Sequence, residues 1–203
     1  MNKAGPVSFE YALKQSGPVA FSTMVKPAGS MCNLDCHYCY YLDKSEQYGN
    51  SQPFMSEELL EEYIKQYITS NDVPQVSFLW HGGEPLLLGI DFYKKALYFQ
   101  KKYSQGKAID NSLQTNGSLI TDEWAHFFSE NNFLIGISID GPEDIHNSFR
   151  VNKAGKLSFE SVMNGLCILK KHNTAFNTLS VVNKVSEGRG LEVYQFLKST
   201  GSH

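Results

Sequence analysis

The chain has 203 residues, 41% of them hydrophobic and 19% charged, and this composition excludes a disordered protein because it can bury a core. Its formal net charge of −3 comes without a run of basic residues, so nucleic acid is not an expected partner. No apolar stretch reaches the roughly 20 residues that cross a bilayer and the polar first residues do not resemble a secretory signal, so we expect a cytoplasmic protein without membrane contact.

Residues 1–20 carry little hydrophobic pattern and are interrupted twice by Gly-Pro, which predicts an N-terminal extension ahead of one domain over residues 21–203. Within that domain, apolar runs alternate with amphipathic segments. In chain order these predict strand 21–26, helix 55–70, strand 75–80, helix 91–103, strand 109–114, helix 121–131, strand 134–139, helix 159–171, strand 178–182 and helix 191–198. This alternation indicates an α/β fold with a parallel sheet and about five βα units.

The first predicted helix and the second predicted strand carry the clearest pattern. Ser56 is a candidate N-cap, and Glu57 and Glu58 suit the first turn of a helix. The apolar stripe of this helix consists of Leu59, Leu60, Tyr63, Ile64, Tyr67 and Ile68. The apolar run over 75–80 is expected to be buried on both faces, as in a parallel sheet covered by helices.

Polar motifs follow four consecutive predicted strands. They are CNLDCHYC with Cys32, Cys36 and Cys39; HGGEP with His81, Gly82, Gly83 and Glu84; QTNG with Gln114 and Asn116; and SIDG with Ser138. The carboxyl ends of parallel strands meet at one edge of a sheet, where α/β proteins collect functional groups. Four motifs in register therefore predict one polar rim around a shared site.

The cysteines are unevenly distributed. Three lie within eight residues, and the fourth, Cys167, falls in a distant predicted helix. Clustered thiols in a chain without an export signal favour metal ligands over disulfides. A structural zinc site needs four ligands, with His37 as a candidate fourth, whereas a 4Fe–4S cluster on three thiolates leaves one iron open to a substrate. The residues alone leave both an iron–sulfur protein and a non-catalytic zinc-binding α/β module open.

The CxxxCxxC loop after the first strand resembles the signature of the radical S-adenosylmethionine (radical SAM) enzymes. The resemblance implies that Cys32, Cys36 and Cys39 hold one 4Fe–4S cluster whose fourth iron binds the amino and carboxylate groups of S-adenosylmethionine (SAM). It also implies a partial (β/α)6-type barrel, so the core over residues 21–203 is expected to be incomplete. The alternative is a five-stranded domain that is complete as it stands.

Longer segments are similar to the anaerobic sulfatase-maturating enzymes. They read PAGSMCNLDCHYCYYLDK, FLWHGGEPLL, LQTNGSLITDEWAHFF and GISIDGPEDIHNSFR. This resemblance implies oxidation of a cysteine or serine of a sulfatase polypeptide to formylglycine. It also implies a C-terminal region with two auxiliary clusters and an aspartate base, which we expect to be missing because no cysteine follows Cys167. A radical SAM maturase of a different peptide is the alternative.

The same resemblance implies contacts to SAM from the first two loops. Tyr38 would pack against the adenine, and Gly82 and Gly83 would let backbone groups approach the methionine amine. Glu84 would bond the cofactor or orient its loop. His81 stands where Gln is also expected in the family, and its polar side chain can still face the cofactor.

Further rim residues acquire roles in the same way. Ser138 and Arg150 match positions that contact the methionine carboxylate and ribose, and the planar guanidinium of Arg150 suits a carboxylate. Asn116 is expected on the cofactor rim, and Tyr41 and Gln114 near the peptide substrate. Outside this family context the same residue types have ordinary interpretations: turn glycines, a solvated arginine and a core tyrosine.

The implied chemistry is reductive. A flavodoxin or ferredoxin would supply one electron to the cluster, and SAM would be cleaved to methionine and a 5′-deoxyadenosyl radical. The radical would remove a hydrogen atom from the β-carbon of the target residue, while the protein positions the reactants and excludes water. Because the base is expected in the missing region, we expect this chain alone to cleave SAM without turning over a sulfatase peptide.

Overall fold

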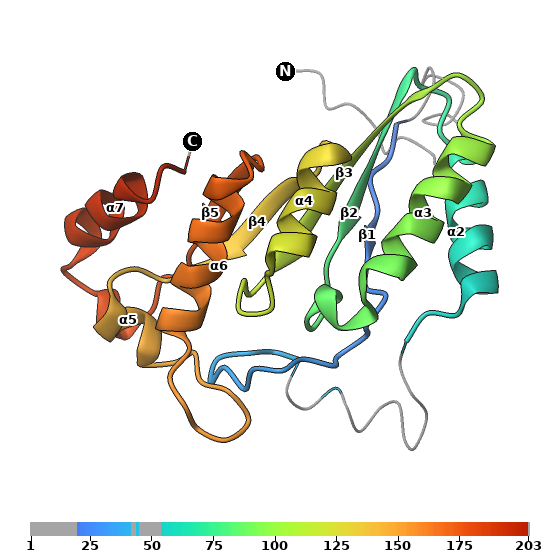
Figure 1. Ribbon diagram of the computed structural model, residues 1–203. Helices are drawn as coiled ribbons and strands as arrows, with labels where there is room; N and C mark the ends of the chain where they lie inside the picture. Colours follow the sequence, from blue (N-terminus) through green and yellow to red (C-terminus); the bar gives the residue numbers. More distant parts are fainter. Residues whose placement is uncertain (1–19, 42–43, 45–53, 203) are drawn as a thin grey trace, which may run out of the picture.

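The computed structural model describes residues 20–41, 44 and 54–202 of the protein (Figure 1). The extension predicted over residues 1–20 lies outside this range except for its last residue. Five parallel strands form one open sheet in the order β1-β2-β3-β4-β5, so each strand pairs with its neighbour in sequence. The sheet confirms the α/β prediction of a partial barrel with five βα units.

The elements follow the predicted alternation. The strands are β1 (Met24–Val25), β2 (Gln75–Trp80), β3 (Ala108–Thr115), β4 (Leu134–Ser138) and β5 (Phe176–Leu179). The α-helices are α2 (Glu57–Ser70), α3 (Ile90–Tyr103), α4 (Asp122–Glu130), α5 (Glu143–Asn147), α6 (Phe159–Lys171) and α7 (Gly190–Ser199). Two 3-10 turns, η2 (Pro85–Leu88) and η3 (Lys184–Ser186), complete the described part.

Strand β1 is shorter than the predicted strand over 21–26. Only Met24 and Val25 pair with β2. The residues before them are bound by side chains that follow or belong to α2: the Phe21 amide donates to Asn71 Oδ1 at 3.0 Å, and the Thr23 and Tyr63 hydroxyls are 2.7 Å apart. These contacts hold the chain away from the β2 ladder.

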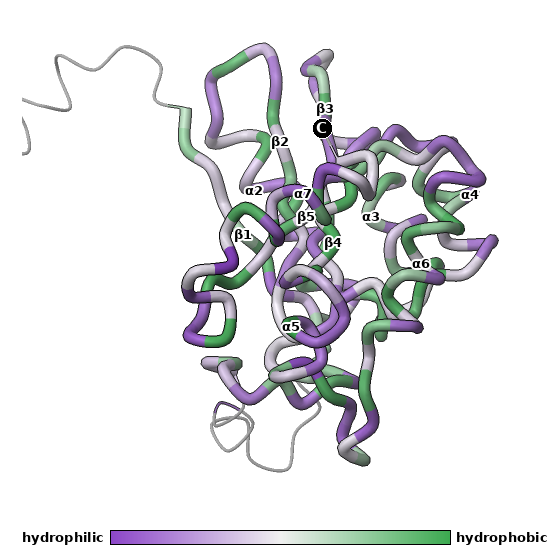
Figure 2. The backbone as a smooth tube through the Cα atoms, turned by 90° about the vertical axis from the view of Figure 1, so that its left-hand side faces the viewer, coloured by the Kyte–Doolittle hydropathy of each residue, from purple (hydrophilic) through white to green (hydrophobic). Residues whose placement is uncertain are grey.

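Strand β2 is buried on one face only, so the expectation of two buried faces is wrong. Val76, Phe78 and Trp80 are buried, whereas Gln75 and Ser77 are exposed. Helices α3, α4 and α6 lie together on one side of the strands, with apolar residues recurring along them (Figure 2). Their buried side chains, with those of α2, form the core against this face. The opposite face is the inner side of an open barrel wall, and no helix of the described residues covers it (Figure 1 and Figure 2).

The helix caps are confirmed, while one member of the apolar stripe is not. Ser56 Oγ accepts the Leu59 amide at 3.3 Å, and Thr121 caps α4 in the same way. Leu59 itself is 56% exposed, because the buried face of α2 is centred on Leu60 and Ile64. Within the described residues, no helix combines the length and apolar character needed to cross a membrane.

Strand β5 ends earlier than predicted, and the short α5 was not predicted. After Leu179 the chain leaves the ladder, since the Ser180 hydroxyl donates to the Asp140 carbonyl oxygen at 3.1 Å and the Val181 amide donates to Asp140 Oδ1 at 3.0 Å. The loops that follow the strands gather at the lower edge of the sheet in Figure 1, where the cysteine loop runs beneath the strand ends. This edge carries the candidate site.

Candidate functional site

Two adjoining cavities open at the carboxyl ends of the strands. The larger, of about 450 Å³, is called the central cavity here and the smaller, of about 350 Å³, the side cavity. The central cavity is lined by Cys36, Tyr38, Cys39, Tyr40, Tyr41, His81, Gly82, Gly83, Gln114, Thr115, Asn116, Ser138, Arg150, Leu179, Ser180 and Val181. The side cavity is lined by Ser30, Met31, Cys32, Leu34, Asp35, Cys39, Tyr41 and Lys153. All predicted site residues except Glu84 therefore border one cavity or both.

The cysteine loop is held in place by the segment after α5. The Asp35 amide donates to the Val151 carbonyl oxygen at 2.7 Å and the His37 amide to the Phe149 carbonyl oxygen at 3.0 Å. Backbone bonds on both sides of Cys36 thus fix the loop, and the Cys39 amide closes a turn onto the Cys36 carbonyl oxygen at 2.8 Å. The loop therefore presents its thiols at the border of the two cavities.

The three thiols lie close enough to affect one another's charge. Burial raises the pKa of Cys36 to about 11, with Arg150 opposing the shift and Cys32 and Cys39 adding to it. Burial also raises the pKa of Cys32. Cys167 is exposed on α6 and borders neither cavity. Among the four cysteines, the structure therefore brings the three predicted metal ligands, Cys32, Cys36 and Cys39, to the site.

The spread of these thiols bears on the metal. Ligands of one zinc ion must converge to about 2.3 Å from a single point. Across residues 20–41, 44 and 54–202, no three His, Cys, Asp or Glu side chains are grouped tightly enough to hold one metal ion. The three thiols at the border of the two cavities are a soft donor set that fits an iron–sulfur cluster. The buried Ser30 hydroxyl, which lacks a partner, adds a polar atom to the lining of the side cavity.

The two glycines after β2 are required by the cysteine loop. Gly82 has a φ of +118°, which side chains rarely adopt. A Cβ on Gly83 would lie 2.0 Å from the Met31 carbonyl oxygen. The amide of Gly83 donates to the Gly29 carbonyl oxygen at 2.9 Å. The glycines therefore let two loops pack together, and their backbone still lines the central cavity.

Glu84 orients loops and does not face the cavity. Its carboxylate is fully buried and accepts the Leu86 amide at 3.0 Å, the Thr115 hydroxyl at 2.8 Å and the Asn116 amide at 2.8 Å. Burial raises its pKa to about 7, against the opposing effect of these bonds. Of the two roles expected for Glu84, the structure supports the orienting one: the carboxylate joins the loop after β2 to the end of β3.

The end of β3 contacts the cysteine loop directly. Asn116 Nδ2 donates to Asn33 Oδ1 at 2.8 Å and lies 3.7 Å from Cys32 Sγ. Gln114 instead donates to the Ser138 hydroxyl at 2.9 Å, on the inner face of the sheet. The two residues predicted from one motif thus serve opposite sides of the central cavity.

The surroundings of His81 favour its neutral form. Burial and the nearby Lys26 cation lower its pKa, and its Nδ1 accepts the Gly82 amide at 2.6 Å. The Lys26 ammonium lies 4.6 Å from the centre of the Tyr41 ring, a distance that allows a cation–π contact. The wall that holds His81 and Tyr41 is therefore polar and aromatic.

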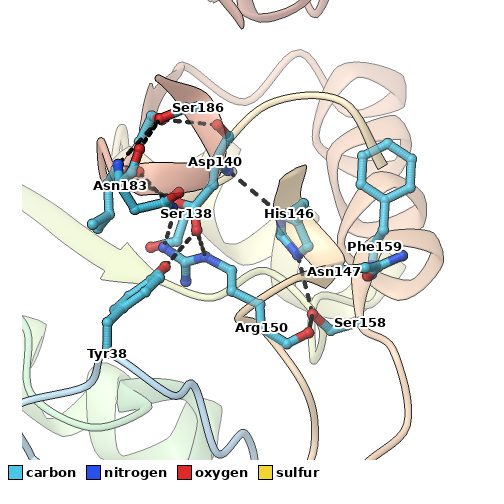
Figure 3. A network of polar contacts seen from close by, with 12 residues as sticks. Tyr38, Ser138, Asp140, His146, Asn147, Arg150, Ser158, Phe159, Asn183 and Ser186 are labelled. Atoms are coloured by element: carbon cyan, nitrogen blue, oxygen red, sulfur yellow. Dashed lines mark hydrogen bonds and ion pairs between the residues drawn. The ribbon is translucent and has the colours of Figure 1, made fainter. Parts of the chain in front are cut away.

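Tyr38 and Arg150 are both bound to Asp140, a residue for which the sequence suggested no role (Figure 3). Arg150 donates through Nε to Asp140 Oδ2 at 2.9 Å and through Nη2 to Oδ1 at 3.0 Å. The Tyr38 hydroxyl donates to Oδ2 at 2.5 Å. The guanidinium fork expected to hold a cofactor carboxylate is thus occupied by a protein carboxylate. The only signals for Asp140 were its place in the SIDG motif and the nearby arginine.

Comparisons with known proteins agree with this geometry. The family model of the Radical SAM superfamily matches residues 27–197. A serine-type anaerobic sulfatase-maturating enzyme of Bacteroides thetaiotaomicron is 52% identical over 181 residues, which cover 89% of this chain and 44% of the relative. A cysteine-type enzyme of Clostridium novyi is 41% identical over 182 residues, covering 88% and 48%.

Solved structures give the same result. Native anSMEcpe with bound AdoMet and the Cp18Cys peptide superposes with a TM-score of 0.80 at 39% identity, covering 89% of this chain and 48% of that one. A spore photoproduct lyase complex, at 19% identity and a TM-score of 0.59, shares the fold. The chain spans about half the length of the curated sulfatase-maturating relatives described above.

Proposed function

The chain belongs to the radical SAM superfamily, and from this premise we propose that it binds one 4Fe–4S cluster through Cys32, Cys36 and Cys39 and binds SAM in the central cavity. The core domain in this proposal comprises residues 21–203. The chemistry that these groups supply when bound is reductive cleavage of SAM to a 5′-deoxyadenosyl radical, which abstracts a hydrogen atom from a substrate.

One observation carries the proposal: the cysteine loop borders a cavity of the right size. Cys36 and Cys39 lie in the lining of the central cavity, opposite residues from the ends of β2, β3 and β4. Its volume of about 450 Å³ falls within the roughly 300–1,000 Å³ of small-molecule sites. A ligand bound there would touch both the thiol loop and the polar rim.

The thiols of this chain supply the metal site. Burial raises the pKa of Cys36 to about 11, so without metal this side chain is a protonated thiol at neutral pH. Cys36 would give up this proton on binding iron, because only the thiolate is a ligand. The donor set leaves room for SAM, since three thiolates leave one iron of a four-iron cluster without a protein ligand.

The remaining lining residues bind and enclose the cofactor. Ser138 offers a hydroxyl group, and Arg150, whose Nε and Nη2 are bound to Asp140, offers its positive charge and remaining N–H groups to the carboxylate and ribose of SAM. Tyr38 offers an aromatic ring to the adenine. Leu179 and Val181 add apolar surface that excludes water from the reacting atoms. The other residues assigned to SAM are His81, Gly82, Gly83 and Asn116.

The substrate in this proposal is a sulfatase polypeptide whose serine or cysteine is oxidised to formylglycine. The relatives bear the names of enzymes that mature sulfatases, and one structural relative holds a peptide. Tyr41 and Gln114 lie in the cavity lining, where the bound peptide would approach. A flavodoxin or ferredoxin is the proposed electron donor.

Anaerobic reconstitution with iron and sulfide tests the cofactor proposal. We expect about four iron and four sulfide ions per chain, as a cubane cluster requires, and binding of SAM. A colourless protein with one zinc ion and no sulfide would contradict it. Incubating the reduced protein with SAM and then analysing for 5′-deoxyadenosine tests cleavage.

A peptide assay tests the substrate. Sulfatase peptides with serine or cysteine at the target position would be compared with a matched peptide that has alanine there, and formylglycine would be detected by mass spectrometry. Because this chain alone is expected to cleave SAM without turning over a sulfatase peptide, stronger SAM cleavage with the first two peptides than with the alanine peptide supports sulfatase maturation. Efficient formylglycine formation by this chain alone would contradict that expectation. SAM cleavage with oxidation of unrelated peptides only would favour a maturase of another substrate.

A further inference from the structure

Asp140 binds three segments that form one wall of the central cavity, yet it does not line the cavity itself. Its carboxylate is fully buried just beyond the end of β4. It accepts hydrogen bonds from Arg150 Nε and Nη2, from the Tyr38 hydroxyl and from the Val181 amide, at 2.9, 3.0, 2.5 and 3.0 Å. One carboxylate thus uses both of its oxygens on four donors.

These donors come from three different loops. Tyr38 lies between the cluster ligands Cys36 and Cys39, Arg150 follows α5, and Val181 follows β5. All three donor residues line the central cavity. Figure 3 shows the side chains of Tyr38 and Arg150 converging on Asp140. The relative position of these three segments of the cavity wall therefore depends on one side chain.

The charge of Asp140 is also needed to compensate the buried positive charge of Arg150. The Arg150 side chain is 8% exposed, and the Asp140 side chain is 0% exposed. A buried guanidinium without its carboxylate would be an uncompensated charge and would shift toward water. The Arg150 guanidinium carbon lies 5.4 Å from the centre of the Tyr38 ring, so movement of Arg150 would also displace the tyrosine.

A histidine fixes the network from the side away from the cavity. The Asp140 amide donates to His146 Nδ1 at 3.5 Å, and His146 Nε2 lies 3.0 Å from the Ser158 hydroxyl. Because that hydroxyl donates to the Arg150 carbonyl oxygen at 2.8 Å, it accepts from His146. The main chains of Asp140 and Arg150 are thereby joined through one buried imidazole.

We infer that Asp140 is the positioning residue of the SAM site: it holds Tyr38 of the cluster loop and Arg150 in the arrangement that binds SAM. The inference rests on the proposed function. It assigns Asp140 no contact with SAM or with the cluster. Its removal is therefore expected to weaken SAM binding while leaving the three thiols able to bind iron.

The experiment compares variants of the full chain after anaerobic reconstitution. Asp140→Asn keeps the size of the side chain but turns one acceptor into a donor that faces other donors. Tyr38→Phe removes only the hydroxyl bond. Asn111→Ala is the matched control, because Asn111 is a buried acceptor for Trp80 Nε1 and Gln100 Nε2, each at 2.8 Å, and does not line the cavity. Iron content and the Kd of radiolabelled SAM, from equilibrium dialysis, are measured for each protein.

We expect Asp140→Asn to raise the Kd for SAM about tenfold or more at unchanged iron content, as truncation of a buried charge pair does. Tyr38→Phe should raise it roughly two- to tenfold, the effect of one hydrogen bond. The double variant should bind no more weakly than Asp140→Asn, because the tyrosine hydroxyl then has no carboxylate to hold it. Asn111→Ala should bind SAM as the unmodified chain does.

Unchanged SAM binding in Asp140→Asn, or equal weakening in Asn111→Ala, would overturn the inference. If Asp140→Asn does not fold, Tyr38→Phe decides, and unchanged binding there overturns it. An unmodified chain that takes up no cluster or no SAM would instead overturn the proposed function, which separates the two failures.

Discussion

Glu84 and His146 are two buried titratable side chains beside the loops of the cavity. Their pKa values are shifted in opposite directions, so their contributions to stability change in opposite directions with pH. Burial raises the pKa of Glu84 to about 7 and lowers that of His146 to about 4. Each side chain is uncharged in the folded protein over the pH range in which it would be charged in the unfolded chain. Folding stability must therefore depend on pH through both.

For Glu84, the folded protein binds the proton more tightly than the unfolded chain. The stabilisation is complete below pH 4.5 and is lost as the pH rises to about 7, an effect of about 3 kcal/mol for a shift of this size. Glu84→Gln cannot titrate, so the free energy of unfolding of the unmodified chain relative to this variant should fall over that range. Urea unfolding at several pH values measures it. A difference that stays constant with pH would contradict the assigned pKa.

For His146, stability changes with pH in the opposite direction. The unfolded chain takes up a proton near pH 6.5 and the folded protein only near pH 4, so stability is complete above pH 6.5 and falls as the pH is lowered to about 4. His146→Gln should be less stable at pH 7, since it loses hydrogen bonds, but it should lose less stability on acidification. The same urea series tests this. Parallel acid curves for both proteins would show that His146 is not the group responsible.

The cysteines offer a matched pair of substitutions. Cys36 is buried beside the central cavity, and Cys167 is exposed on α6. Cys36→Ala removes a proposed ligand and should abolish most of the iron uptake, whereas Cys167→Ala should retain the full amount. Iron and sulfide analysis after reconstitution measures both. Equal losses in the two variants would mean that the ligand set is wrong.

At the scale of elements, the packing of the loop after β2 against the cysteine loop is the contact most sensitive to size. Gly83→Ala places a Cβ 2.0 Å from the Met31 carbonyl oxygen, so the two loops must separate. We expect a loss of about 1–3 kcal/mol in stability, typical of overpacking, and weaker cluster uptake.

Gly190→Ala is the control for this prediction, because its Cβ would meet nothing within 4 Å at the start of α7. It should be neutral or slightly stabilising, since alanine favours a helix. Thermal unfolding and iron content are measured for both variants. A Gly83→Ala protein with unmodified stability and iron content would show that the two loops can separate at no cost.

The element scale also shows what the sequence can predict. Strand β2 and helix α6 have the predicted bounds. Their ends could be predicted because the hydrophobic pattern that marks them lies within the segment itself. The ends of β1 and β5 were mispredicted, since bonds to Asn71 and to Asp140 remove residues from the ladder. Helix α5 has five residues, too few for a period to be recognised.

The site could be predicted only in part for the same reason. The motifs place the thiols, glycines and amides at one edge because parallel strands share it. The role of Asp140 depends on Tyr38 and Val181, which are 102 and 41 residues away in the sequence. The role of Asp140 can therefore be recognised only in the folded structure, where these loops meet. The orienting role of Glu84 likewise depends on donors from the end of β3.

At the scale of the whole molecule, the fold brings the loops at one end of an open sheet around two adjoining cavities, with three thiols at their border. The helices stabilise one face of the sheet, and the strand ends are left for function. In the proposed function, this edge binds an iron–sulfur cluster and SAM, and Asp140 holds Tyr38 and Arg150 in the lining of the central cavity.

The central claim is that the cluster has an iron that the protein leaves open and that SAM binds there. Electron paramagnetic resonance of the reduced, reconstituted chain tests it most directly, with the spectrum recorded before and after SAM is added. We predict a 4Fe–4S signal whose g-values change on addition of SAM. Adenosine, which lacks the methionine moiety of SAM, should leave the signal unchanged. A cluster signal that is identical with and without SAM would contradict the account.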